Sequence, residues 1–92
     1  MTRRYRAKAD RNQPQVVKAL RAAGWAVRHT HTIGQGWPDL VVAKQGVTAV
    51  VEIKMPGEKL TDAEVEFFET WPGAKMIVYD EQDAVDKAGA LL

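Results

Sequence analysis

The stretch that decides the fold is residues 38–54, Pro38-Asp-Leu-Val-Val-Ala-Lys-Gln-Gly-Val-Thr-Ala-Val-Val-Glu-Ile-Lys54. Two apolar runs flank Gln45-Gly46, and this arrangement predicts a β-hairpin in which Lys44 faces Val47. The runs are continuous rather than alternating, which is typical of strands covered on both faces. We therefore expect this hairpin to lie in the centre of a sheet.

The same register places Asp39 directly opposite Glu52. Two carboxylates that face each other across a strand pair are destabilising. A fold tolerates them more readily when a cation sits between them. Lys54 falls on the same face as Glu52, because strand side chains alternate with a period of two. Burial makes both Glu52 and Lys54 costly unless they are paired or bound to metal. Two acids and a lysine on one face suggest a divalent-metal site that handles phosphates.

Phosphodiester cleavage with Mg²⁺ needs few protein groups. Mg²⁺ takes oxygen ligands, keeps several waters and binds one or two protein carboxylates. Asp39 and Glu52 supply those carboxylates in this hypothesis, and the backbone carbonyl of Ile53 is available as a further ligand. Lys54 supplies positive charge that can orient the attacking water or stabilise the transition state.

A purely structural interpretation stays open for each of these residues alone. Asp39 could cap the loop before its strand, since Pro-Asp is common in turns. Glu52 and Lys54 could be a polar stripe at the end of a strand. The catalytic interpretation gains weight because all three meet across a single hairpin that is otherwise apolar.

The sequence around the hairpin predicts further elements. On the N-terminal side, Asn12 is a good N-cap for a helix over residues 13–23, and Gly24 is a typical terminator. Residues 25–31 are expected to form an edge strand, followed by a glycine-rich loop over residues 33–37.

On the C-terminal side, Thr61 and Glu64 form a capping box that begins a second helix. Val65, Phe68 and Trp71 are expected on one side of it, and Pro72-Gly73 ends it. A short buried strand over residues 74–79 and a last helix from Asp80 or Glu81 complete an α-β-β-β-α-β-α order. Because the second helix joins two strands, it predicts a parallel crossover in a mixed α/β sheet.

Composition limits the alternatives. Ninety-two residues make one domain, 46% apolar, with no cysteine for disulfides or thiolate zinc sites. The sequence shows no signal peptide and no membrane-spanning run, so we expect a cytoplasmic protein.

Charge is distributed unevenly along this domain. Residues 12–92, the predicted domain, hold eight basic residues against eleven acids. Residues 1–11 form a basic arm with five basic residues and one acid; the bases are Arg3, Arg4, Arg6, Lys8 and Arg11. Such an arm fits contacts with a phosphate backbone, and it fits equally well a solvated tail.

Gly36-Trp-Pro-Asp39 followed by Glu52-Ile-Lys54 resembles the PD-(D/E)XK nuclease signature. The resemblance is closest to the VRR-NUC family, the small virus-type replication and repair nucleases. It extends from Asn12 through the glycine loop and the hairpin to the Leu60-Thr61 helix start. The ordered set of helix, glycine loop, hairpin and capped helix is more specific than the acid-x-Lys pattern alone.

The resemblance implies a restriction-endonuclease-like core, a mixed four-stranded sheet flanked by helices. It implies Mg²⁺ or Mn²⁺ held by Asp39, Glu52 and the carbonyl of Ile53, with Lys54 catalytic. It also implies a homodimer that cuts branched or four-way (Holliday) junction DNA, in the cytoplasm of a bacterial or phage-infected cell, with no membrane partner. A two-fold dimer would place two sites for paired nicks.

The chain departs from the family pattern at two places. Relatives often carry a glutamate on the first helix, where the nearest candidate here is Gln15, a weaker metal ligand or none. Relatives also tend to have a glutamine in the second helix, where this chain has Glu64-Val65. These departures leave room for a catalytically weak or inactive nucleic-acid-binding module on the same fold. A small α/β interaction protein with no DNA role is the third alternative.

Three aromatic or imidazole side chains near the predicted site also have two interpretations each. Trp37 could stack on a base or wedge a junction, or it could pack on the hairpin. His29 and His31 share one face of a strand and could bind a metal or a phosphate. Both histidines could also be partly exposed polar positions without a role.

Overall fold

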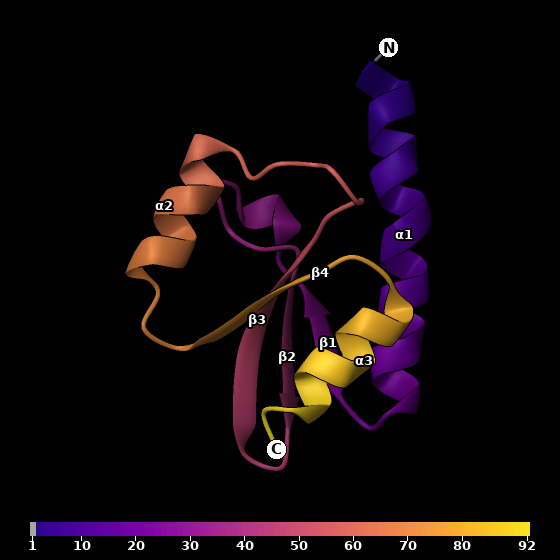
Figure 1. The fold of residues 1–92 in the computed structure, drawn as a ribbon, viewed down its shortest axis with the longest axis vertical. Helices are drawn as coiled ribbons and strands as arrows, with labels where there is room; N and C mark the ends of the chain where they lie inside the picture. Colours follow the sequence, from indigo (N-terminus) through magenta and orange to yellow (C-terminus); the bar gives the residue numbers. More distant parts are fainter. Residues whose placement is uncertain (1) are drawn as a thin grey trace.

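The structure is a computed structural model that describes residues 2–92, with side chains from Asn12 onward. Its elements follow the predicted order, with one short 3₁₀ helix added after the first strand (Figure 1). They are α1 (Thr2–Ala22), β1 (Ala26–His29), η1 (His31–Ile33), β2 (Leu40–Lys44), β3 (Val47–Ile53), α2 (Asp62–Thr70), β4 (Ala74–Val78) and α3 (Glu81–Gly89).

The four strands form one mixed sheet in the order β1-β2-β3-β4. The hairpin β2–β3 is antiparallel with Lys44 opposite Val47, as the sequence predicts. β3 and β4 are parallel, and α2 forms the crossover between them. The predicted mixed α/β sheet with a central hairpin and an edge strand β1 is therefore confirmed.

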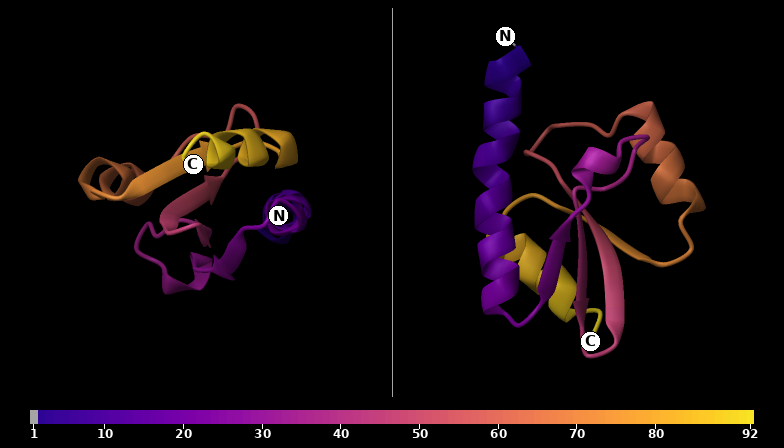
Figure 2. Two further views of the ribbon diagram at one scale, coloured as in Figure 1. Left: turned by 90° about the horizontal axis from the view of Figure 1, so that it is seen from below. Right: turned by 180° about the vertical axis from the view of Figure 1, so that it is seen from behind.

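One face of this sheet carries the main hydrophobic core. α1 and α3 lie side by side, and α2 lies apart from both on the other side of the molecule (Figures 1 and 2). α1 buries Val16, Val17 and Leu20 in this core. The sheet contributes alternate residues of each strand, as a half-buried face requires; they are Val27, Leu40, Val42, Ala49, Val51, Ile53, Met76 and Val78.

The opposite face of the central hairpin is also buried. Val50, Glu52 and Lys54 alternate with the core residues of β3 and are 1%, 3% and 6% exposed. This arrangement explains the continuous apolar run in β3, because both of its faces are covered. It also places Glu52 and Lys54 on the side of the sheet away from the main core.

The predicted start of the first helix was wrong. α1 begins at Thr2 rather than after Asn12, and it contains Pro14. Asn12 does not cap it; its side-chain amide donates to the backbone oxygen of Tyr79 at 3.3 Å. Arginine, lysine and alanine dominate residues 2–11 and have high helix propensity, so a helix forms there without apolar periodicity. The side chains of the predicted basic arm lie outside the described side chains.

The predicted end of the first strand was wrong. It ends at His29, and His31 belongs to η1, so the two histidines do not share one strand. The capping box of Thr61 and Glu64 is confirmed, and Val65, the next residue of α2, is 37% exposed. α2 buries none of its residues fully, because it stands apart from the main core. Within residues 2–92, no helix is both long and apolar enough to cross a bilayer.

Candidate active site

Asp39 reaches across the hairpin to the neighbouring strand. The turn at Gln45-Gly46 has positive φ at both positions, 54° and 80°, which fits the two-residue turn that sets hairpin register. One step beyond the pair of Leu40 and Val51, the register places Asp39 opposite Glu52 at the end of β3. The backbone N–H of Ile53 donates to Asp39 Oδ2 at 2.8 Å. The predicted meeting of Asp39 with the end of β3 is confirmed.

The backbone that leads into β2 is fixed from the side of β1. The N–H of Thr30 donates to the backbone oxygen of Asp39 at 2.8 Å. The hydroxyl of Thr30 donates to the backbone oxygen of Pro38, also at 2.8 Å. Pro38 itself is fully buried. Asp39 is therefore oriented by contacts to both of its neighbouring strands.

Lys54 lies between two carboxylates. Its Nζ is 3.4 Å from Oε2 of Glu52 and 2.8 Å from Oε1 of Glu64. Glu64 is the third residue of α2, and its Oε1 also accepts the N–H of Thr61 at 2.9 Å. The predicted sharing of a face by Glu52 and Lys54 is confirmed, and α2 adds a third acid to the site.

Sequence reasoning missed Glu64 as a site residue, although it identified the capping box. The predicted parallel crossover could have indicated Glu64, because such a crossover brings the helix back beside the end of β3. The carboxylate of Glu64 therefore has two roles. It caps the N-terminus of α2, and it forms an ion pair with Lys54.

Burial and mutual repulsion shift the protonation of the acids. Burial, followed by the negative charges of Asp39 and Glu64, raises the pKa of Glu52 to about 8. Burial also raises the pKa of Asp39, and this effect exceeds the opposing hydrogen bond from Ile53. In the protein without metal, Glu52 is therefore largely protonated at neutral pH.

Lys54 and Glu64 behave as a charged pair. Burial acts against the charge of Lys54, but the hydrogen bond to Glu64 and the charge of Glu52 outweigh it and raise the pKa of Lys54. Burial also disfavours the charged form of Glu64, which by itself would raise its pKa. The hydrogen bond from Lys54 outweighs this effect and lowers the pKa of Glu64 below its ordinary value. The site thus holds one ammonium against three carboxyl groups.

The donor set fits a hard divalent cation. Among the described side chains, Oε1 of Glu52 is buried and has no hydrogen-bond partner, and such an orphaned polar atom in a native protein calls for a bound water or ion. The described residues contain no group of three or more His, Cys, Asp or Glu side chains that could hold a metal. Mg²⁺ requires less, since one or two carboxylates with waters suffice. Asp39 and Glu52 meet that requirement.

The glycine-rich loop is attached to α2. Gly36 has a φ of 80°, and a Cβ there would collide with the backbone carbonyl of Ala63 in the first turn of α2. Trp37 packs against Phe67 and Trp71 with ring centroids 5.1 and 5.6 Å away. Trp37 therefore packs on Phe67 of α2 and on Trp71, the residue that follows this helix. Through these contacts, the loop before Asp39 fixes the helix that presents Glu64.

Three further predicted residues have described side chains. Gln15 is exposed on α1, and no hydrogen bond among the described side chains links it to Asp39 or Glu52. Nε2 of Gln13 donates a 3.0 Å hydrogen bond to Nδ1 of His29. His31 is close enough to Asp39 for its charge to lower the pKa of that carboxyl, against the effect of burial.

Comparison with protein-family models, with curated proteins and with solved structures gave no match to this chain. The site comprises the buried carboxyl group of Glu52, the half-buried carboxyl group of Asp39, and an ammonium held by two acids.

Proposed function

We propose that this protein is a metal-dependent nuclease that hydrolyses phosphodiester bonds in DNA. The observation that carries the proposal is the buried Oε1 of Glu52, which has no hydrogen-bond partner within residues 12–92 and lies on the strand that Asp39 contacts. An oxygen atom in that state costs free energy unless a cation or a water binds it. A divalent cation would satisfy it and relieve the repulsion between the two acids.

Each residue then has a distinct task. Asp39 and Glu52 would hold Mg²⁺, or Mn²⁺ in its place, and the carbonyl of Ile53 is the further ligand that the family resemblance implies. The cation supplies positive charge that stabilises the phosphoryl oxygens during attack. The hydrogen bond from the N–H of Ile53 orients Asp39. Lys54, held by Glu52 and Glu64, provides an ammonium that stabilises the additional charge of the transition state.

The substrate proposal rests on the resemblance to the VRR-NUC family. That resemblance favours branched or four-way junction DNA and a homodimer with two sites for paired nicks. The basic residues at the start of α1 are consistent with this choice, because lysine and arginine side chains bind phosphates and release counterions.

Asp39→Asn is the variant that tests the proposal. Asparagine keeps an oxygen that can accept the N–H of Ile53, so the fold is retained, but it removes an anionic metal ligand. We expect Mg²⁺-dependent cleavage of junction DNA to fall by at least about 100-fold. The measurement is cleavage of labelled four-way junction, flap and duplex DNA, each with Mg²⁺ or with EDTA.

Asp62→Asn is the matched control, because Asp62 is exposed in the first turn of the same helix that carries Glu64. It should cut as the wild type does. Wild-type activity that persists in EDTA, or in Asp39→Asn, would contradict the proposal.

A nucleic-acid-binding module without catalysis is the second candidate. It is favoured by one observation, that Lys54 already gives Glu52 and Glu64 a positive partner. In that case the acids and the lysine would be a buried ion network with a structural role. Binding of branched DNA without cutting at any Mg²⁺ or Mn²⁺ concentration would decide for this candidate.

A further inference from the structure

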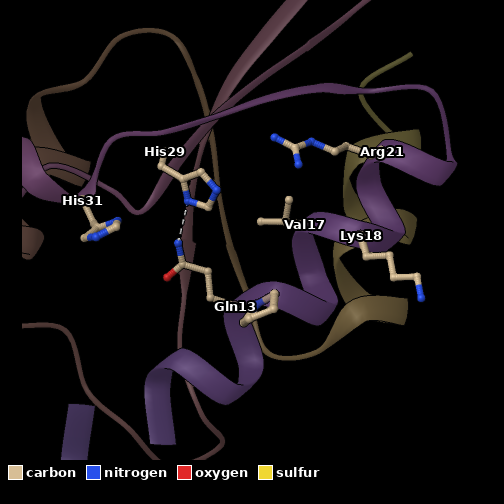
Figure 3. Close-up of a pocket in the computed structure, with 7 residues that line it drawn as sticks. Gln13, Val17, Lys18, Arg21, His29 and His31 are labelled. Atoms are coloured by element: carbon tan, nitrogen blue, oxygen red, sulfur yellow. Dashed lines mark hydrogen bonds between the residues drawn. The ribbon is translucent and has the colours of Figure 1, made fainter. Parts of the chain in front are cut away.

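A groove of about 580 Å³ lies between α1 and the edge strand β1, outside the candidate active site. Figure 3 shows its lining side chains, which come from two turns of α1 and from the end of β1 with the start of η1. Its size is within the range of ligand sites in proteins. It has room for a base and its sugar but not for a double helix.

The lining of the groove combines an apolar floor with a basic rim. Pro14 and Val17 supply apolar surface on the α1 side. Lys18 and Arg21 follow on the same helix, and two histidines stand opposite. Among the described side chains that line the groove, from Gln13 onward, none is acidic. This asymmetry is notable because residues 12–92 carry more acids than bases.

Several of these polar groups are already held in place. Gln13 and His29 share a hydrogen bond of 3.0 Å across the groove (Figure 3). Arg21 donates to the backbone oxygen of Val27 at 3.2 Å, which places its guanidinium along the free edge of β1. Groups that are fixed before binding lose less conformational entropy when a ligand arrives. The groove is therefore a partly preorganised surface.

Thr30 links the groove to the candidate active site. Thr30 lies between the two histidines in the chain, and its N–H donates to the backbone oxygen of Asp39. The rings of His29 and His31 are 6.2 Å apart and nearly perpendicular. His31 is near enough to act electrostatically on Asp39. A ligand beside either histidine would thus lie next to Thr30, the residue whose N–H contacts the backbone of Asp39.

We propose that this groove binds an unpaired strand of nucleic acid, with a base on the apolar floor and its phosphates against Lys18 and Arg21. Proteins that hold single strands combine a basic track with aromatic side chains on which bases stack. Lys18 and Arg21 supply the basic track, and the rings of His29 and His31 stand beside the apolar floor as stacking surfaces. This proposal rests on the nuclease proposal, which supplies the substrate class. It specifies that an unpaired strand of that nucleic acid approaches the candidate active site along the groove.

The test is binding of a fluorescein-labelled oligothymidylate in EDTA, followed by anisotropy over a series of salt concentrations. We compare Lys18→Glu with Lys75→Glu, which changes the net charge equally on β4 at the other edge of the sheet. Lys18→Glu is expected to weaken binding by about 10-fold or more and to reduce the salt slope by about 0.7 per lost contact. Lys75→Glu is expected to change the affinity less than about 2-fold.

Equal losses in both variants, or no loss in Lys18→Glu, would overturn the proposal. His31→Ala provides a second variant that leaves Lys18 in place, and circular dichroism checks that each variant is folded. A labelled duplex of equal length is the comparison ligand, and tighter binding of the duplex at the same groove would also overturn it. Because EDTA prevents cleavage, the proposal can fail while the nuclease proposal stands, and the reverse also holds.

Discussion

Replacing Glu52 by glutamine is expected to abolish Mg²⁺-dependent cleavage and to stabilise the metal-free protein at pH 8. Glutamine has nearly the same shape, but it cannot become an anionic ligand. Cleavage should fall by at least about 100-fold, the scale seen when one charge-stabilising group is removed from an active site. Stability should rise because the variant no longer buries a carboxylate whose charged form is disfavoured. Opposite effects on activity and stability are typical of functional sites.

The two effects are measured separately, cleavage on junction DNA and the free energy of unfolding from urea titrations. Glu66→Gln is the control, because Glu66 is exposed on α2 and should change neither quantity appreciably. Loss of stability together with loss of cleavage in Glu52→Gln would indicate a structural role for Glu52. Lys54 keeps its 2.8 Å contact with Glu64 in this variant, so the substitution does not leave the ammonium without a partner.

The stability of the metal-free wild type is expected to fall as the pH rises from about 5 to 9. The pKa of Glu52 is about 8 in the folded protein and has an ordinary value of 4.5. Between these values the folded state binds more protons than the unfolded state, so stability falls as the pH rises. Asp39 acts in the same direction, since its pKa is also raised. The free-energy cost of ionising the buried Glu52 is absent below its ordinary pKa of 4.5. It is complete once the pH is well above its folded pKa of about 8.

The expected loss is a few kcal/mol, since one pKa unit corresponds to about 1.4 kcal/mol. Urea unfolding in EDTA at closely spaced pH values measures it, and Glu52→Gln should remove most of the slope. Millimolar Mg²⁺ should restore stability at pH 8, because a ligand that binds only the folded state stabilises it. A wild-type profile that is flat, or that rises over this window, would show that Glu52 is not held in the environment described above.

Local signals were enough to predict the hairpin and the meeting of its polar ends. Gln45-Gly46 fits a two-residue turn, and the continuous apolar runs require two covered faces. Together they fixed the register, and the register brought Asp39 to the end of β3. The period of two then placed Lys54 beside Glu52. These inferences depend only on residues close to one another in the sequence.

Contacts that depend on tertiary packing could not be predicted in the same way. Glu64 was visible as part of a capping box, but its contact with Lys54 depends on where the crossover returns the helix. The surroundings of Trp37 stayed open between DNA and the hairpin, and in the structure its ring packs on Phe67 of α2 and on Trp71, the residue after that helix. The start of α1 was missed because apolar periodicity reports burial rather than helix formation.

A titration of the metal-free protein with Mn²⁺, followed by electron paramagnetic resonance, tests the central claim most directly. The claim is that Asp39 and Glu52 share one divalent cation. Wild type and Asp62→Asn should then show one saturable site per chain, and Asp39→Asn and Glu52→Gln should both lose it. No saturable binding by the wild type, or equal binding by all four proteins, would contradict the account.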